Sequence, residues 1–194
     1  MDINLYCTEM GRENPGVPII FLHGNGGNSS SFFYLFTHYA KTRRVIAIDT
    51  RGHGRSPRGD GEFTLSRFRD DLHGFMVENN IPKADLIGYS DGGNIALLFA
   101  LAYPEMVNSM VLAGANLFPK GLEDKDMRWI RDTWKKSKKA LRRNPQNGKA
   151  LKTYELMCLM VNEPNISPES LSKINCPALV IVGDRDAIKP EHSK

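Results

Sequence analysis

Five short apolar runs constrain the fold of this chain more than any other feature. They are rich in Val, Ile and Leu, are bounded by Gly, Pro or Asp, and span residues 17–22, 44–48, 84–87, 107–113 and 178–182. Uninterrupted apolar runs of this length are typical of strands buried on both faces, as in a parallel sheet. Helical patterns occupy residues 64–80 and 94–102, between the runs. Alternating strands and helices predict an α/β fold with a doubly wound, mostly parallel sheet.

The segment at residues 118–170 interrupts this alternation. It is strongly charged, carries helical patterns at 127–141 and 150–160, and contains no convincing strand. Because the strand pattern resumes after it, we interpret the segment as an inserted helical cap. The expected domain organisation is a first part of the core at 1–117, the cap, and a second part of the core at 171–194.

The side chains of this predicted cap allow more than one interpretation. Its large apolar residues could pack on the sheet or line a substrate cleft, and they are Trp129, Trp134, Tyr154, Met157 and Met160. We take Trp129 as the candidate substrate contact. The basic residues favour a solvated helix face, with an anion-binding patch as the alternative. They cluster at Lys135, Lys136, Lys138, Lys139, Arg142 and Arg143.

The composition is that of one globular unit. With 194 residues, of which 41% are hydrophobic and 25% charged, the chain has enough apolar material for one sizeable core. Cys7, Cys158 and Cys176 are widely spaced, which argues against a disulfide framework or a zinc site. The N-terminus does not resemble a signal peptide, and the apolar runs are too short to span a bilayer. We therefore expect a cytoplasmic protein with neither a membrane nor a nucleic acid as partner, and a homo-oligomer is left open.

The sequence Gly88-Tyr89-Ser90-Asp91-Gly92 carries the strongest chemical signal. It follows the strand-like run ADLI and precedes the helical run NIALLFALA. A G-x-S-x-G turn between a strand and a helix holds its serine in a strained conformation, and its glycines let the helix pass close to the strand. The Ser90 hydroxyl would then lie at a helix N-terminus, where N–H groups favour developing negative charge. The alternative is a glycine-rich turn with an incidental serine.

Two further glycine-containing segments accompany this turn. HGNGGN at 23–28 follows the run VPIIFL, and DTRGHGRS at 49–56 follows RRVIAI. Glycines in the first segment let backbone N–H groups approach a bound carbonyl, so we assign an oxyanion hole to the N–H groups of Asn25 and Asp91. His23 lies beside this loop and is expected to have a structural role rather than that of a general base.

Together the three segments resemble the α/β-hydrolase superfamily, whose members often carry H-G, D-x-R-G-x-G-x-S and G-x-S-x-G in this order. The match extends over about residues 17–194. The resemblance implies a serine hydrolase with Ser90 as the nucleophile. It also implies a scaffold turn at residues 51–54, in which His53 is not catalytic.

The same resemblance selects the catalytic acid. After the run at 178–182 the sequence offers Asp184 and Asp186. The superfamily pattern is a glycine, two residues and then the acid, which selects Asp186 after Gly183. Its carboxylate would hold a histidine in one tautomer and stabilise the imidazolium. Asp184 is the second choice, and helix capping by both carboxylates is the alternative.

The histidine of such a triad has no convincing counterpart in this sequence. It is expected after the acid, beyond one more helix and strand. Only His192 follows Asp186, and so short a separation places it on the next helical turn, pointing elsewhere. We therefore expect the last strand, the last helix and the catalytic histidine to be absent from this chain. Without that strand the sheet would end in an unpaired apolar edge.

A serine nucleophile with an oxyanion hole implies acyl transfer to water through an acyl-enzyme. The stretches GYSDGG, VLAGAN and INCPALVIVGDRD are similar to the small esterases of the valacyclovir hydrolase and biphenyl-hydrolase-like group. We therefore expect hydrolysis of a small carboxylic ester without a metal or cofactor. The Asp91 carboxylate could contact a cationic group of the substrate, or could simply be solvated or cap the helix. A catalytically inactive binding protein and a carbon–carbon bond hydrolase with an anion-binding cap are the alternatives.

Overall fold

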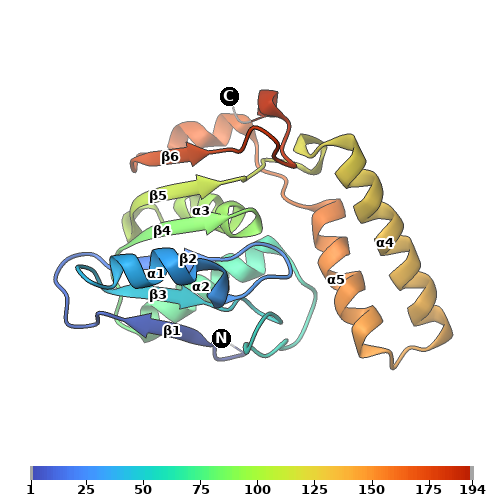
Figure 1. Ribbon diagram of the computed structural model, residues 1–194, viewed down its shortest axis with the longest axis horizontal. Coiled ribbons are helices and arrows are strands. Elements are labelled where there is room, and N and C mark those ends of the chain that lie inside the picture. The colour runs from blue at the N-terminus through green and yellow to red at the C-terminus, as the bar shows by residue number, and fades with distance from the viewer. Residues whose placement is uncertain (1, 193–194) are drawn as a thin grey trace.

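Six strands form one mixed sheet at the centre of the molecule. The computed structural model describes residues 2–192 (Figure 1). In sheet order the strands are β1 (Cys7–Met10), β3 (Val45–Ile48), β2 (Ile19–Leu22), β4 (Ala84–Tyr89), β5 (Val107–Ala113) and β6 (Ala178–Ile181). β1 pairs antiparallel with β3, and the other neighbours pair in parallel. This arrangement confirms the predicted α/β fold with a mostly parallel sheet.

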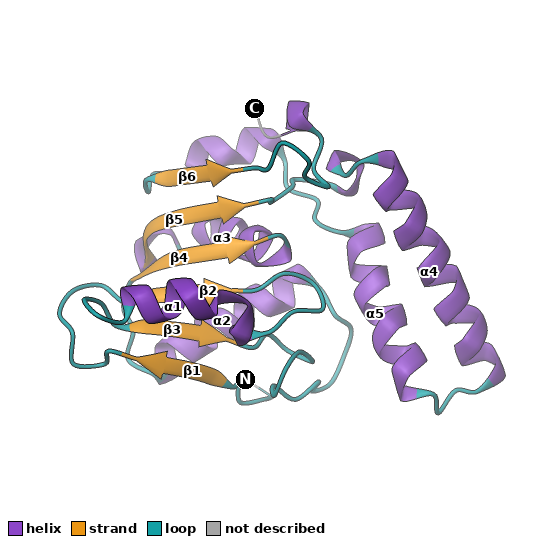
Figure 2. Ribbon diagram, in the orientation of Figure 1, coloured by secondary structure: helices purple, strands orange, loops and turns teal. Residues whose placement is uncertain are grey.

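Helices cover both faces of the sheet, as Figure 2 shows. α2 (Leu65–Glu78) and α3 (Asp91–Ala102) lie on one face, and α1 (Phe33–Tyr39) lies on the other. α2 begins after Thr64, whose hydroxyl accepts a hydrogen bond from the N–H of Arg67 at 3.1 Å and so satisfies one free N–H of the first turn. The sheet is therefore doubly wound.

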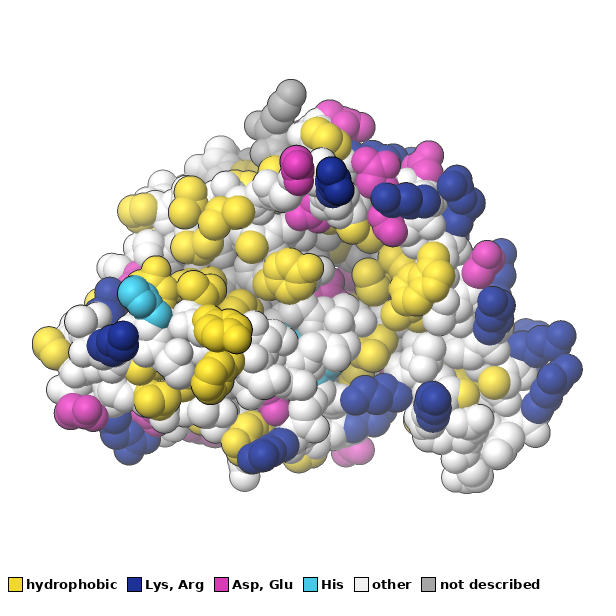
Figure 3. All heavy atoms as spheres, viewed as in Figure 1, with side chains coloured by type: hydrophobic (Ala, Val, Ile, Leu, Met, Phe, Trp, Pro, Cys, Tyr) yellow, Lys and Arg dark blue, Asp and Glu magenta, His cyan; other side chains and the backbone are white. Residues whose placement is uncertain are grey.

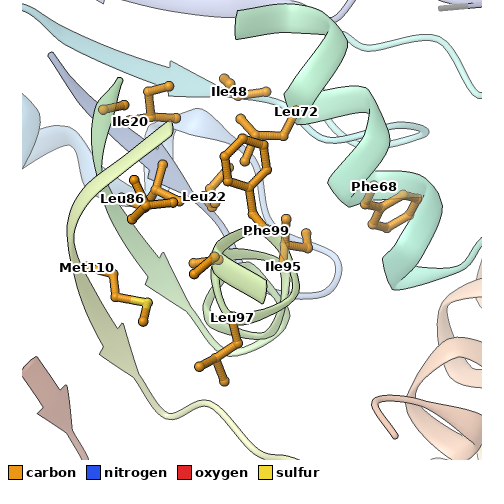
Figure 4. Packing of buried hydrophobic residues seen from close by; sticks show 14 of the residues in the cluster. Ile20, Leu22, Ile48, Phe68, Leu72, Leu86, Ile95, Leu97, Phe99 and Met110 are labelled. Carbon is orange, nitrogen blue, oxygen red and sulfur yellow. The ribbon is translucent and has the colours of Figure 1, made fainter. Parts of the chain in front are cut away.

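The larger apolar core lies between the sheet and helices α2 and α3. Figure 4 shows its side chains, which include Ile20, Leu22, Ile48, Leu86 and Met110 from the strands and Phe68, Leu72, Ile95, Leu97 and Phe99 from the helices. On the opposite face Ile19 and Phe21 pack with Phe32 and Phe36. Because side chains alternate along a strand, β2 contributes to both cores. Burial on both faces explains why these strands are continuous apolar runs in the sequence.

A pair of helices lies beyond the carboxyl ends of the parallel strands (Figure 1). α4 (Asp124–Arg143) and α5 (Gly148–Asn162) pack against each other, and we call them the α4–α5 hairpin. They enclose a third, smaller apolar cluster formed by Leu122, Met127, Ile130, Leu156, Met157 and Ile188. The chain returns to the sheet afterwards as β6, which pairs with β5. The hairpin is thus an insertion between two neighbouring strands.

β6 forms one edge of the sheet. Leu179, Val180 and Ile181 of this strand and the following Val182 are all exposed by 40% or more. An apolar edge strand without a neighbour is uncommon in folded proteins, because it offers free backbone groups and apolar surface for association. The exposed edge agrees with the expectation from the sequence.

A buried carboxylate joins the two loops that follow β2 and β3. Asp49 is almost fully buried and accepts hydrogen bonds from the N–H of Ser29 at 2.6 Å and of Arg55 at 2.8 Å. Gly54 adopts a φ of +51°, and a Cβ there would lie 2.0 Å from Oδ2 of Asp49. A larger residue therefore cannot replace this glycine without moving the carboxylate.

Two buried histidines complete this connection. Nε2 of His23 accepts the N–H of Thr50 at 3.0 Å, while its Nδ1 donates to the carbonyl of Gly24 at 2.8 Å. Nδ1 of His53 lies 3.0 Å from the carbonyl of Arg51, and Nε2 of His53 has no hydrogen-bond partner within residues 2–192. Burial lowers the pKa of His23 and lowers that of His53 to about 4. Both rings are therefore neutral at pH 7.

The main core is expected to dominate stability. Phe99 is fully buried between α3 and the sheet, so Phe99→Ala should lower the free energy of unfolding by about 3–5 kcal/mol. Phe33 is 62% exposed, and Phe33→Ala should change it by less than about 0.5 kcal/mol. Urea unfolding followed by circular dichroism measures both values. Equal effects of the two substitutions would contradict this placement of the core.

Acid should weaken the fold through His53. Its pKa lies near 4 in the folded state and near 6.5 in an unfolded chain, so the unfolded state binds the proton first and stability falls as the pH drops below about 6.5. When the pH is lowered from 7.5 to 5.5, the free energy of unfolding of the native chain should fall by about 1 kcal/mol more than that of His53→Gln. His38→Gln is the control, because His38 is exposed. Parallel pH profiles for the native chain and His53→Gln would show that His53 titrates normally.

Candidate functional site

Ser90 occupies the turn between the end of β4 and the first residue of α3. Its φ is 53° and its ψ is −121°, a strained combination for a residue with a side chain. The turn is held by the N–H of Ser90, which donates to the carbonyl of Ala113 at 2.7 Å, and by the Ser90 carbonyl, which accepts the N–H of Gly93 at 2.8 Å. This conformation is the one expected of a G-x-S-x-G turn.

Two glycines make the turn possible. A Cβ at Gly88 would lie 2.3 Å from the carbonyl oxygen of Gly92, and a Cβ at Gly92 would lie 1.9 Å from the carbonyl oxygen of Leu22 on β2. Both distances are far below van der Waals contact. The start of α3 therefore rests directly on the backbone of the sheet, and Ser90 is lifted to the carboxyl ends of the strands.

Ser90 lines two adjoining cavities beneath the α4–α5 hairpin. The larger has a volume of about 660 Å³ and a mainly apolar wall, to which Phe32, Leu35, Val111, Trp129, Met157 and Met160 contribute. The smaller has a volume of about 70 Å³ and contains three carboxylates, those of Asp91, Glu163 and Asp186. The nucleophile candidate thus lies between an apolar space and an acidic one.

Asp186 faces the same small cavity as Ser90. One carboxylate oxygen accepts the N–H of Gly183 at 3.3 Å, and the other accepts the N–H of Ile188 at 3.1 Å. Gly114, at the end of β5, has a φ of +61°, and a Cβ there would come within 3.4 Å of the Asp186 carboxylate. Asp184 is exposed and lines neither cavity. The geometry therefore groups Asp186, and not Asp184, with Ser90.

The loop that holds Asn25 passes beside the serine. A Cβ at Gly24 would lie 3.0 Å from Cβ of Ser90, so only a small residue fits there. The N–H of Asp91 opens the first turn of α3 and has no acceptor within the helix. The side chain of Asn25 has a further role that the sequence did not predict. Its Nδ2 donates to Oδ2 of Asp91 at 3.0 Å and to the carbonyl of Leu156 at 3.2 Å.

Asp91 is a buried carboxylate with few compensating partners. Burial, the largest cause, and the nearby charge of Glu163 raise its pKa to about 6, against the opposing hydrogen bonds from Asn25 and Asn94. Glu163 follows directly after α5 and accepts the N–H of Leu65, the first residue of α2, at 2.7 Å. Burial raises the pKa of Glu163 as well. Sequence reasoning missed Glu163, because nothing in its local pattern distinguishes it from a solvated acid.

The aromatic residues of the α4–α5 hairpin divide into two groups. Trp129 lines the larger cavity and is 62% exposed at its rim. Trp134 and Tyr154 stack on each other inside the hairpin, with ring centroids 6.3 Å apart, and line neither cavity. The structure thus places Trp129 at the cleft, where the sequence expected a substrate contact.

The histidines within residues 2–192 line neither cavity. Nε2 of His192 accepts the N–H of Leu117 at 2.7 Å, and its ring packs edge-on against Phe118 with centroids 4.5 Å apart. The same ring fills the space beside Gly121, where a Cβ would lie 2.7 Å from it. His192 is therefore held as a packing residue with Nε2 occupied, as its short separation from Asp186 suggested.

The described part of the chain contains no group of three or more His, Cys, Asp or Glu side chains that could hold a metal ion. None of its helices has the length and apolar character needed to cross a membrane.

Comparisons with known proteins agree with this geometry. Residues 17–153 match the model of the alpha/beta hydrolase fold family. The serine hydrolase BPHL of Mus musculus is 30% identical over 190 residues, which cover 89% of this chain and 64% of the relative. A 2-hydroxymuconate semialdehyde hydrolase of Pseudomonas sp. (strain CF600) is 35% identical over 112 residues, which cover 56% of this chain and 40% of the relative. The chain thus spans about two fifths to two thirds of the length of these relatives.

Solved structures show the same fold. An enol-lactonase from Burkholderia xenovorans LB400 superposes with a TM-score of 0.78 at 21% identity, covering 98% of this chain and 82% of that one. A thermophilic esterase from Thermogutta terrifontis gives a TM-score of 0.74 at 24% identity, covering 98% of this chain and 79% of that one. With the matched family model, the strained serine turn and the sheet order, the chain belongs to the α/β-hydrolase fold family.

Proposed function

We propose that the protein is a serine hydrolase that cleaves a small carboxylic ester through an acyl-enzyme on Ser90. The strained turn that carries Ser90 into a cleft shared with Asp186 is the observation that supports this proposal most strongly. A structural turn would not need to hold a serine in this conformation at the mouth of a 660 Å³ cavity. Hydrolases among the relatives support the same reaction class.

In the proposed mechanism Oγ of Ser90 attacks the ester carbonyl and forms a tetrahedral intermediate. The backbone N–H groups of Asn25 and Asp91 stabilise the negative oxygen, because they lie beside the nucleophile and carry partial positive charge. Collapse releases the alcohol and leaves the acyl group on Ser90, and water then hydrolyses this ester. A base must accept the proton of Ser90. No histidine within residues 2–192 lines either cavity, so we place the base, oriented by Asp186, outside these residues.

The electrostatics of the cleft favour a neutral or cationic substrate. Asp91, Glu163 and Asp186 face the small cavity, and neither cavity is lined by Lys or Arg within residues 2–192. A cation there would neutralise Asp91, whose burial makes its charge costly. We propose that Asp91 contacts an amino group of the substrate, as in an amino-acid ester, and that Trp129 and its apolar neighbours contact the remainder.

A carbon–carbon bond hydrolase is the second candidate, supported by the similarity to 2-hydroxymuconate semialdehyde hydrolases. Such a reaction on an acidic substrate would need a cation to bind the carboxylate, and the basic cluster of α4 lines neither cavity. Within residues 2–192 this basic cluster therefore gives no support to an anion-binding cleft. The three carboxylates near Ser90 oppose the same substrate class.

Ester hydrolysis should depend on Ser90 and on a base. Turnover of p-nitrophenyl acetate and butyrate is measured for this chain, for the same chain extended by any sequence encoded downstream, and for Ser90→Ala in both. We expect turnover by the extended chain only, and a loss of about 10³-fold or more in kcat with Ser90→Ala. Turnover by residues 1–194 alone would show that a described histidine serves as base. Equal rates for the native chain and Ser90→Ala would show that Ser90 is not the nucleophile.

Selectivity for an amino group should depend on Asp91. The ratio of kcat/KM for an alanine p-nitrophenyl ester over p-nitrophenyl propionate compares two substrates that differ by one amino group. Asp91→Asn should lower this ratio at least tenfold, because it removes the facing charge while keeping the shape. Asp184→Asn is the matched control, since Asp184 is exposed and outside both cavities. An unchanged ratio in Asp91→Asn would leave Asp91 as a helix-capping residue only.

A further inference from the structure

The α4–α5 hairpin carries a charge opposite to that of the remaining molecule. Residues 124–162 contain eleven Lys and Arg against four Asp and Glu, whereas the rest of the chain contains fifteen against eighteen. Six of these cations lie within nine residues at the end of α4, with no acid among them, and they are Lys135, Lys136, Lys138, Lys139, Arg142 and Arg143. We call these six residues the basic face.

The basic face is a continuous outer surface of one helix. At about 100° per residue the six positions fall within roughly half of the helix circumference. All six residues are exposed, while Ile130 and Ser137 on the opposite side are buried. In Figure 3 the Lys and Arg side chains follow the outer edge of the hairpin. The cations therefore point away from the protein as a group.

Neutralising partners for the basic face are lacking within residues 2–192. The acids of the hairpin that form ion pairs bind elsewhere, Glu155 to Arg58 and Asp124 to Lys189. The ammonium of Lys138 lies 5.0 Å from the centroid of the Trp134 ring. This contact does not neutralise the positive charge of Lys138. The helix dipole favours cations in the last turn, which accounts for Arg142 and Arg143 but not for Lys135, Lys136 and Lys138.

A second exposed feature is found at the rim of the cleft. Leu35, Tyr89, Trp129 and Ile181 line the larger cavity and are each exposed by at least 47%. Trp129 lies on α4 as well, at the border of the helix face that carries the cations. Figure 3 shows hydrophobic side chains over the sheet and beside the hairpin. The cations of the hairpin are visible on the same side of the molecule.

We propose that the basic face docks the protein on an anionic lipid surface, with Trp129 and the apolar rim of the cleft at the level of the headgroups. Clusters of four to eight Lys and Arg on a helix bind anionic bilayers, and exposed Trp favours the membrane interface. A convex row of diverging cations matches a flat layer of anions, whereas a small anion would need donors that converge in a cavity. This proposal departs from the expectation from the sequence that no membrane is a partner, which rested on the lack of a signal peptide and of an apolar run long enough to span a bilayer.

A nucleic acid fits this surface less well. Helices that read DNA present amide or hydroxyl side chains among their cations, and single strands are held by aromatic side chains on which bases stack. The segment 135–143 offers one buried serine and no aromatic residue. The apolar rim would also have no counterpart in a phosphate backbone.

Vesicle sedimentation tests this proposal. The chain is spun down with vesicles of phosphatidylcholine alone or with 30% phosphatidylserine, at 50 and 300 mM NaCl. We expect binding to the anionic vesicles at low salt, little binding to neutral vesicles, and loss of binding at high salt. A blue shift of tryptophan emission should accompany binding and vanish in Trp129→Phe.

Charge-reversal variants identify the surface. The triple variant Lys135→Glu/Lys139→Glu/Arg142→Glu should bind anionic vesicles at least tenfold more weakly than the native chain. The control variant Lys41→Glu/Lys83→Glu/Lys173→Glu changes the net charge equally, at exposed residues outside the hairpin, and should bind as the native chain does. Circular dichroism confirms that both variants fold. Ser90→Ala should bind vesicles normally, so this test is independent of the proposed reaction.

Several outcomes would overturn the proposal. Absence of binding to anionic vesicles, or equal loss in the two triple variants, would leave the basic face as a solvated surface. Tighter binding to a short DNA duplex than to vesicles under the same conditions, lost in the α4 variant, would identify a nucleic-acid surface instead.

Discussion

The contact between the first turn of α3 and the backbone of β2 determines where the chemistry of this molecule lies. Gly92 approaches the carbonyl of Leu22 so closely that a single methyl group would prevent the packing. Because the helix cannot move away from the sheet without breaking the main core, the strain appears at the residue before it, and Ser90 adopts its positive φ. Burial of Phe99 and Ile95 on the same helix holds this position. The energy of the core thus maintains a local conformation that a serine would not adopt by itself.

The same edge of the sheet collects the other groups of the site. The loops after β2, β5 and β6 begin beside the turn after β4 that carries Ser90, because parallel strands place their carboxyl ends together. The α4–α5 hairpin then closes the space over them and brings Glu163 next to Asp91. Exclusion of water from this region raises the pKa of both carboxylates and strengthens their interaction with any cation. The hairpin therefore shapes the substrate preference that we propose, while its outer face carries an unrelated charge pattern.

Much of this arrangement follows from local sequence patterns. The predicted strand at 107–113 matches β5, and the other predicted strands differ from the observed ones by one or two residues at their ends. α3 begins three residues earlier than its apolar pattern suggested, because Asp91, Gly92 and Gly93 already belong to the helix. β1 and α1 were not predicted: β1 has four residues, partly exposed, and pairs with a strand distant in the sequence. Ser90 could be proposed from the sequence because its neighbouring glycines have a local pattern, and Asp186 because the superfamily resemblance supplies the spacing from Gly183. Glu163 and the Asn25 side chain were missed, since their roles arise from contacts between distant segments.

We propose above all that the strained serine is the reactive group of the cleft. Labelling with a fluorophosphonate, followed by peptide mass spectrometry, tests it most directly, using the longest chain that the gene encodes. We predict a single phosphonylated residue, Ser90, with no label in Ser90→Ala and slower labelling in Asp186→Asn. Modification of another serine, or an unlabelled native chain, would contradict the account and favour an inactive binding protein with an inherited fold.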